Sequence, residues 1–409
     1  MSTTRGVIVL TTIVALPGPA LRLTGTHLGT VSDTTLFGLT IVAAAFLLSW
    51  AAEAAEVDIS QGLAIAFIAL IAVLPEYAVD MTFAWKAGQD PEFAPFAVAN
   101  MTGANRLLIG LGWPLVVGMF WLRTKSRRIL LEGSHSVAII ALSAATLYSF
   151  TIPFTGVIGL YDTLILVVIF IAYVYVIARA PTEEPELVGP ALSIGLLPRR
   201  QRRITISIIF VFAAATILAV AEPFAEGLVH SGEVLGVDEF LLVQWVAPLA
   251  SEAPEFLIAG ILAFRGRGAV AIGVLLSSKV NQWTLLVGGL PVAFGLSSGS
   301  LGGLPLDDRQ ALEVLLTAAQ SAFAVALLIG LSLSTRQAML LFALFAVQFA
   351  IPTTAVRVAI SVAYVVLTVG IVVVKRADVP ALMRSARGAY HAVEGATQST
   401  DAESSSDDV

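Results

Sequence analysis

The sequence predicts an all-α protein that crosses a membrane many times, and three observations support this. The 409-residue chain is 57% hydrophobic and only 13% charged, whereas a soluble domain carries about a quarter charged residues. Its apolar runs are long enough to cross hydrocarbon about 30 Å thick, which takes roughly 20 helical residues. Its basic residues fall almost entirely on one side of the predicted spans. A chain this apolar cannot cover its surface with polar groups by folding alone.

About twelve spans are predicted in chain order. The runs cover residues 6–22, 34–52, 61–86, 93–122, 135–153, 156–178, 204–229, 239–264, 268–295, 310–333, 337–351 and 355–374. The first run has an alternative interpretation as a cleaved signal peptide, because Arg5 precedes a short apolar stretch that ends in Pro-Gly-Pro-Ala. The eleventh run is short for a span.

The basic residues predict the orientation of the chain. Loops on one side hold 17 of them, and loops on the other side hold only Arg22, Lys86 and Arg309. Because cytoplasmic loops carry excess Lys and Arg, the first side is expected to be cytoplasmic, with both termini there. We expect a multi-pass protein of the plasma or inner cell membrane.

Polar segments set the expected boundaries. The longest connection, residues 181–203, divides the chain near its middle, and the Ser- and Asp-rich end is too polar to pack. The expected parts are an N-terminal membrane segment (1–33), a first half (34–180), a cytoplasmic linker (181–203), a second half (204–351), an extra span (352–376) and a disordered acidic cytoplasmic tail (377–409).

Composition excludes several classes of chemistry. The chain has no cysteine, so disulfides, thiol catalysis and cysteine metal sites are absent. Its four histidines are far apart in sequence and form no H-E-x-x-H motif, which argues against a histidine-based metalloenzyme. No basic cluster has the surroundings of a nucleic-acid site. The expected partners are the lipid bilayer and inorganic cations, and no protein partner is evident.

Residues 72–114 and 249–291 form a sequence repeat. Each copy has Pro-Glu in mid-span, then a short polar turn and an Asn-bearing span that ends in Gly and Pro. The copies begin in the third and eighth predicted spans, and this odd separation means that they cross the membrane in opposite directions. Inverted repeats with interrupted helices are typical of secondary transporters, whose substrate site lies at the midplane.

The paired motifs resemble the alpha repeats of the sodium/calcium exchanger family, within the calcium/cation antiporter superfamily. They read Leu74-Pro75-Glu76 with Gly103-Ala104-Asn105, and Ala253-Pro254-Glu255 with Ser277-Ser278-Lys279-Val280-Asn281. The resemblance covers about 45 residues in each half. It implies a 5+5 helix exchanger core at about 34–351, with one extra helix at each end. It also implies a secondary active cation antiporter that exchanges Ca²⁺ for Na⁺ or H⁺ by alternating access, without a cofactor.

Both glutamates of the repeat, Glu76 and Glu255, fall near the middle of their spans. An unpaired carboxylate there costs many kcal/mol and takes up a proton instead, unless a bound cation removes the cost. Hard cations such as Ca²⁺ take six to eight oxygen ligands. The prolines add oxygens, because each leaves a carbonyl of the preceding turn, in Ile71 and in Ala250, without its helical donor.

The resemblance implies an ion site that combines these carbonyls with polar side chains of both copies. The implied residues are Glu76 and Glu255 as metal ligands, with Asn105, Asn281, Ser251 and Ser278. Alternatives remain open for each type. A protonated glutamate would bond another helix, an asparagine would join two helices, and a serine would bond back to its own helix.

The chain also departs from the family pattern. Ala72 and Val73 stand where small hydroxyl residues are usual before the first Pro-Glu, and Lys279 stands where an Asn is usual. Arg106 directly follows Asn105. A fixed ammonium in place of one bound sodium, or H⁺ as the counter-ion, would account for these departures. Alternatively, Lys279 snorkels to the membrane surface or pairs with an acid of its own repeat.

Two further acids, Asp80 and Glu252, lie one turn from the glutamates toward the predicted external side. One interpretation is an acidic outer vestibule that attracts cations. The other is that they neutralise the intramembrane cations Lys279 and Arg106. A third intramembrane cation, Arg357, falls within the last span.

Rival functions have weak sequence support. Tyr161-Asp162 is half of an intramembrane aspartyl-protease signature without its G-x-G-D partner. Residues 295–299 match G-x-S-x-G but have no identifiable histidine partner. A non-transporting membrane scaffold would not need acids at mid-span in two inverted copies. The sequence therefore predicts a transporter rather than an enzyme.

Overall fold

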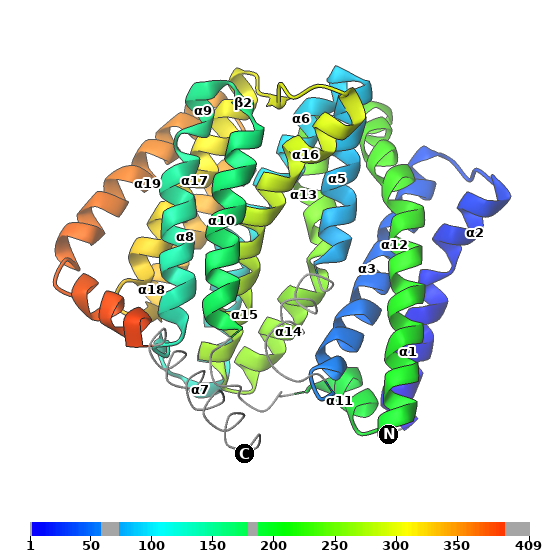
Figure 1. The fold of residues 1–409 in the computed structure, drawn as a ribbon, viewed down its shortest axis with the longest axis horizontal. Coiled ribbons are helices and arrows are strands. Elements are labelled where there is room, and N and C mark those ends of the chain that lie inside the picture. Colours follow the sequence, from blue (N-terminus) through cyan, green and yellow to red (C-terminus); the bar gives the residue numbers. More distant parts are fainter. Residues whose placement is uncertain (1, 59–72, 179–186, 389–409) are drawn as a thin grey trace, which may run out of the picture.

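The computed structural model describes residues 2–58, 73–178 and 187–388, and almost all of them are helical (Figure 1). The helices of the first half are α1 (Ser2–Ala15), α2 (Pro17–Thr24), α3 (Thr30–Ala55), α5 (Leu74–Gln89), η1 (Pro91–Phe93), α6 (Ala94–Leu107), η2 (Leu108–Gly112), α7 (Trp113–Thr124), α8 (His135–Ser149), α9 (Ile152–Thr155) and α10 (Leu160–Ile177). Those of the second half are α11 (Gly189–Gly195), α12 (Arg199–Leu235), α13 (Glu239–Ser251), α14 (Ala253–Phe264), α15 (Gly268–Asn281), η3 (Gln282–Leu286), α16 (Val287–Ser298), α17 (Asp308–Leu328), α18 (Thr335–Ala350) and α19 (Thr354–Val374).

Most of the predicted spans have a matching helix. Within the described ranges, nine helices are long and apolar enough to cross a membrane, and the bent pair α13–α14 makes ten. The eleventh predicted span is the shorter apolar helix α18, of 16 residues. The third span is described only from its α5 half, because residues 61–72 lie outside the described residues. The prediction of an all-helical membrane fold is therefore confirmed.

Two antiparallel strand pairs close opposite ends of the bundle. Strand β1 (Arg128–Leu130) pairs with β4 (Ser332–Ser334), with Ile129 opposite Leu333. Strand β2 (Val157–Ile158) pairs with β3 (Leu304–Pro305). Each pair joins a loop of the first half to a loop of the second half, so the two halves are linked at both ends of the molecule.

The long helices α3 and α12 pack side by side on one side of the bundle, next to α1 and α2 (Figure 1). At one end Arg202 donates two hydrogen bonds to Asp58, at 2.8 and 2.6 Å. Near the other end the Ser231 hydroxyl donates to Thr34 Oγ1 at 3.1 Å. Polar contacts at both ends therefore join the first long helix of each half.

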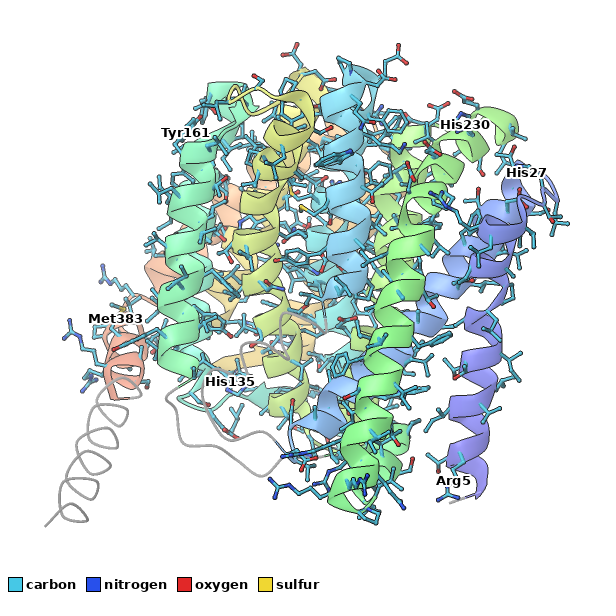
Figure 2. The ribbon with its side chains drawn as sticks, turned by 45° about the vertical axis from the view of Figure 1, so that its right-hand side comes forward. Arg5, His27, His135, Tyr161, His230 and Met383 are labelled. Atoms are coloured by element: carbon cyan, nitrogen blue, oxygen red, sulfur yellow. The ribbon has the colours of Figure 1, made fainter. Side chains whose placement is uncertain are left out.

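The two ends of the bundle differ in charge. Arg5 and His135 lie at one end, whereas His27, Tyr161 and His230 lie at the other (Figure 2). The Arg5 end also holds the start of α12, with the basic residues 199–203, and the end of α7 (Figure 1). This distribution is the one that the loop charges predicted.

The three basic residues expected on the opposite side each contact a carboxylate. Arg22 pairs with Glu222 at 2.8 Å, and Lys86 pairs with the same carboxylate at 3.1 Å. Arg309 pairs with Asp238 at 2.9 Å. The few positive charges at this end are therefore neutralised locally.

Both polar segments contain helical residues. Within 181–203, α11 and the start of α12 are helical. The tail 377–409 is not disordered throughout, because residues 379–388 form a helix that buries Leu382 to 6% exposure. Burial of an apolar side chain supplies the free energy that a purely polar tail lacks. Residues 389–409 lie outside the described residues.

Candidate functional site

Both Pro-Glu motifs begin a helix inside the bundle. Helix α5 begins at Leu74 with Pro75 in its first turn, and α14 begins at Ala253 with Pro254 in its first turn. Proline is tolerated there because a first-turn amide has no helical acceptor to lose. Helices α13 and α14 meet at an angle of 57°. The break predicted in the second copy is therefore present, whereas Ile71, the corresponding carbonyl of the first copy, lies outside the described residues.

The two glutamates lie in the first turn of these helices. Glu76 is 4% exposed and Glu255 is half-buried. Glu76 lies within electrostatic range of Glu255, Asp80 and Lys279. One oxygen of each, Glu76 Oε1 and Glu255 Oε2, is buried without a hydrogen-bond partner in the described part of the chain. The fold thus brings together two carboxylates, each with an unused oxygen, at the positive ends of two helix dipoles.

Lys279 connects the two repeats. It is fully buried on α15, and its Nζ donates to Asn105 Oδ1 on α6 at 2.5 Å and to the Asn105 carbonyl at 3.3 Å. Its Nζ also lies 4.5 Å from the centre of the Trp283 ring, a cation–π contact. Lys279 does not snorkel, and among the described residues it forms no ion pair with Glu252, although the two lie within electrostatic range.

Two contacts that the sequence did not predict hold the second copy. Tyr77 donates its hydroxyl hydrogen to Asn281 Oδ1 at 2.9 Å. Gln282 Nε2 donates to Glu252 Oε1 at 2.7 Å. Tyr77 directly follows Glu76, and Gln282 directly follows Asn281. Their position next to predicted site residues is the sequence feature that could have indicated them.

Asp80 and Glu252 are inside the protein rather than in an open vestibule. Their exposed fractions are 0% and 1%. Both oxygens of Asp80 and both amide atoms of Asn100 lack a hydrogen-bond partner among the described residues. Neither acid pairs with Arg106, which contacts Glu313 at 2.6 Å instead. In this structure the two acids therefore do not form an open vestibule and do not contact Arg106, because packed helices enclose them.

The two serines differ in environment. Ser251 is 3% exposed, and its hydroxyl donates to the carbonyls of Ala247 and Pro248 at 3.2 and 3.3 Å. This is the bond to its own helix that was the alternative to an ion-binding role. Ser278 is half-buried beside Lys279.

Each asparagine helix continues into a π-helical turn. Segment η2 begins three residues after Asn105, and η3 begins directly after Asn281. Such turns leave backbone groups outside the regular α-helical pattern and are frequent at functional sites. Their presence in both copies extends the internal symmetry to the backbone.

In the described ranges, no three or more His, Asp and Glu side chains are grouped so that they could hold a metal ion. A hard cation bound here would combine the two glutamates with amide and carbonyl oxygens.

The protease motifs have structural roles. Asp162 caps the start of α10, where it accepts from Tyr148 Oη at 2.5 Å and from the Gly159 amide at 2.6 Å. Ser297 is half-buried at the end of α16, and its hydroxyl donates to the Trp85 carbonyl at 2.6 Å.

Comparison with known proteins identifies similar sequences and folds. The family profile described as sodium/calcium exchanger protein matches residues 34–179 and 205–354. The crystal structure of the H⁺/Ca²⁺ exchanger CAX is 42% identical, with a TM-score of 0.90, and the match covers 95% of this chain and 98% of that one.

More distant structures share the fold alone. The Ca²⁺/H⁺ antiporter protein YfkE is 14% identical with a TM-score of 0.57, over 88% of this chain and 99% of that one. The sodium-calcium exchanger NCX_Mj, soaked with 10 mM Na⁺ and no Ca²⁺, is 15% identical with a TM-score of 0.53, over 79% and 99%. No protein with a curated description matches the chain.

Proposed function

This chain belongs to the sodium/calcium exchanger protein family, and we propose that it exchanges Ca²⁺ for H⁺ across its membrane by alternating access. It is a multi-pass membrane protein and a secondary cation transporter, not an enzyme. The H⁺/Ca²⁺ exchanger CAX, which is 42% identical over 95% of the chain, supports this choice of ions.

The observation that carries the proposal is the proximity of Glu76 and Glu255 in the first turns of α5 and α14, inside the bundle. Each has an oxygen without a partner in the described residues, so each can accept a cation without giving up a contact. Pro254 leaves the Ala250 carbonyl without its helical donor, and we propose this carbonyl as a further oxygen of the site. We propose that these groups bind Ca²⁺ when they are ionised and are neutralised by protons when Ca²⁺ has left.

Lys279 supports H⁺ rather than Na⁺ as the counter-ion. Its ammonium is fully buried and bonds the oxygen of Asn105 that would otherwise be available to a monovalent cation. A positive charge that never leaves the protein thus occupies part of the implied ion site. We propose that it replaces one bound sodium.

The charges inside the bundle support an electroneutral exchange. The described helices hold five interior carboxylates (Glu76, Asp80, Glu252, Glu255 and Glu313) and three interior cations (Lys279, Arg106 and Arg357). The count leaves out Asp33, Glu53 and Asp162, which are also buried or half-buried. These three lie in the end turns of α3 and α10, near the ends of the bundle, whereas Glu76 and Glu255 lie where helices begin inside it. The formal interior charge is therefore −2, which one divalent cation or two protons neutralise. Buried net charge is costly, so both loaded states are favoured over the empty one.

The orientation of the chain is also part of the proposal. We place the Arg5 end of the bundle, with residues 199–203, in the cytoplasm, and the loop that holds Asp307 and Asp308 outside. The membrane is proposed to be the plasma or inner membrane. Residues 1–33 and 352–376 are proposed as additions to the two repeat halves, 34–180 and 204–351.

Flux measurements in proteoliposomes test the proposal. Purified protein should move Ca²⁺ inward when the lumen is acidic, and should carry H⁺ outward at the same time. An imposed Na⁺ gradient at constant pH should not drive Ca²⁺. If Na⁺ drives Ca²⁺ and a pH gradient does not, the assignment of the counter-ion is wrong.

A further inference from the structure

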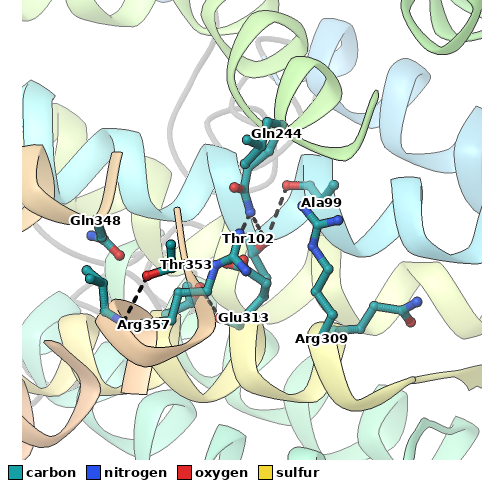
Figure 3. A network of polar contacts seen from close by, with 12 residues as sticks. Ala99, Thr102, Gln244, Arg309, Glu313, Gln348, Thr353 and Arg357 are labelled. Carbon is teal, nitrogen blue, oxygen red and sulfur yellow. Dashed lines mark hydrogen bonds and ion pairs between the residues drawn. The ribbon is translucent and has the colours of Figure 1, made fainter. Parts of the chain in front are cut away.

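A second cluster of buried charges lies outside the Pro-Glu site, between α6 and the helices α17 and α19 (Figure 3). Glu313 Oε2 contacts Arg106 Nη2 at 2.6 Å, and Glu313 Oε1 contacts Arg357 Nε at 2.7 Å. The exposed fractions of Glu313, Arg106 and Arg357 are 0%, 2% and 5%. Each oxygen of one carboxylate is therefore bound by a different guanidinium.

Gln244 joins this cluster to the asparagine helix of the first repeat. Its Nε2 lies 3.2 Å from Glu313 Oε2 and 3.3 Å from Thr102 Oγ1 on α6 (Figure 3). Helices α6 and α13 touch here, because a Cβ built on Gly103 would lie only 1.8 Å from the Gln244 carbonyl oxygen. Helices α6 and α13 are therefore so close that no side chain larger than that of glycine fits at position 103 without moving one of them.

Two more glutamines hold the main chain of α6. Arg106 Nη1 donates to Gln348 Oε1 at 3.3 Å, and Gln348 Nε2 donates to Gln320 Oε1 at 3.2 Å. Gln320 Nε2 then donates to the Arg106 carbonyl at 3.2 Å. That carbonyl precedes η2, where the α-helical hydrogen-bond pattern changes. Both the side chain and the carbonyl of Arg106 are therefore fixed from α17 and α18.

Stability alone does not explain this cluster. Buried ion pairs cost desolvation, and well-packed apolar side chains are often as stable or more so. Charged groups at membrane depth are expensive and usually functional. The guanidinium of Arg106 also lies 5.0 Å from the centre of the Trp245 ring, which fixes its plane. We therefore interpret the contacts of Arg106 with Glu313 and Trp245 as restricting the orientation of its side chain rather than as adding to the stability of the fold.

The cluster reaches the ion site through one residue. Arg106 directly follows Asn105, whose side-chain amide donates to the Met101 carbonyl at 2.8 Å. The direction of Asn105 Oδ1 is therefore set by the rotation of α6, and this oxygen accepts from Lys279. In the second repeat the residue after the asparagine, Gln282, points to the site acid Glu252 instead. Among the described residues, the residue after the asparagine is therefore bound by helices outside the repeat in the first copy and not in the second.

We propose that Arg106 is a positioning residue of the exchange reaction: held by Glu313, it fixes the rotation of α6 that presents Asn105 to Lys279 and the cation. This inference rests on the proposed function. It places the determinant of cation affinity in a cluster that does not itself touch the ion.

Two matched variants test it. Arg106→Gln leaves the neutral pair Glu313–Arg357, and Arg357→Gln leaves the neutral pair Glu313–Arg106. Each variant removes one buried guanidinium. Only Arg106→Gln breaks the ion pair between α6 and α17, because Arg357 lies on α19. Because Arg106→Gln removes the buried ion pair that joins α6 to Glu313, it should raise the KM for Ca²⁺ at least about tenfold, with a maximal rate within about threefold. Arg357→Gln should change KM by less than about threefold.

Two further measurements separate positioning from general damage. Arg106→Lys keeps the charge but loses the two-pronged guanidinium, so its KM should fall between the wild-type and Arg106→Gln values. Adding Arg106→Gln to Asn105→Ala should raise KM no further than Asn105→Ala alone, because both changes act through one amide.

Defined outcomes overturn the inference. Equal KM values for Arg106→Gln and Arg357→Gln, or additive effects of Arg106→Gln and Asn105→Ala, would show that the cluster is only structural. Either outcome in a preparation whose wild type exchanges Ca²⁺ for H⁺ refutes the inference and leaves the proposed function standing. A wild type without exchange refutes the proposed function itself.

Discussion

Replacement of Lys279 by Asn tests how the protein balances its interior charge. The ammonium is fully buried and contributes one of three positive charges against five interior carboxylates. The formal interior charge is −2 in the native protein and −3 in the variant. In the native protein, one Ca²⁺ or two protons restore neutrality, so a cycle moves no net charge. In Lys279→Asn, one Ca²⁺ leaves a charge of −1 whereas three protons leave none, so each cycle moves one net charge.

The size of the effect follows from the membrane potential. One elementary charge moved through 100 mV is worth about 2.3 kcal/mol. Because 1.4 kcal/mol corresponds to a factor of ten, this potential should shift the equilibrium Ca²⁺ ratio of Lys279→Asn by roughly 40-fold. The native ratio should not change with potential.

Proteoliposomes provide the assay. Vesicles with a fixed pH gradient and an internal Ca²⁺ indicator are given a K⁺ diffusion potential of about 0 or 100 mV. Arg309→Gln is the matched control, because it removes one positive charge from an ion pair with Asp238 at the end of the bundle. This control should behave as the native protein does. A Ca²⁺ ratio in Lys279→Asn that does not respond to potential would refute the reasoning and leave Lys279 a structural residue.

Three other expectations concern the site, the packing and the orientation. Glu76→Gln and Glu255→Gln should each reduce Ca²⁺ flux more than about 100-fold while the protein stays folded, because a neutral amide cannot balance a divalent cation. Gly103→Ala should lower the unfolding temperature measured in detergent, because its Cβ must move at least 1.2 Å to reach 3.0 Å from the Gln244 carbonyl, an overpacking cost of about 1–3 kcal/mol. Gly118→Ala, with open space at its Cβ, should not. Arg200→Cys in this cysteine-free chain should react with an impermeant thiol reagent only after the membrane is opened.

Each of these has a control. Glu92→Gln removes an exposed carboxylate outside the interior and should leave flux near the native value, whereas normal flux in either site variant would contradict the assignment of the site. Asp308→Cys lies at the opposite end and should react from outside. Labelling of Arg200→Cys in intact cells would reverse the orientation. Equal unfolding temperatures for Gly103→Ala and Gly118→Ala would mean that the close approach of α6 and α13 does not constrain the fold.

Much of the architecture was predictable because hydrophobic length and loop charge are local properties of the chain. Runs of roughly 20 apolar residues predict spans wherever they occur, since a helix is the simplest way to satisfy backbone groups in hydrocarbon. The inverted repeat was equally visible, because Glu76 and Glu255 each follow a proline and each precede an asparagine span. The two copies begin five spans apart, and because five is odd, they cross the membrane in opposite directions.

The partners of the interior charges were not predictable. The sequence left three roles open for Lys279, as a substitute for a bound sodium, as a snorkelling residue or as the partner of Glu252. The fold directs its ammonium to Asn105, 174 residues away. It offered Asp80 and Glu252 either as an outer vestibule or as partners of Lys279 and Arg106, whereas the partner of Arg106 is Glu313, on a helix outside the repeat. Side chains at membrane depth must find partners across helix contacts, and which helices touch depends on their packing in three dimensions. The sequence by itself therefore determined the spans, the repeat and the acids at its centre, and only the tertiary structure decided which charge meets which.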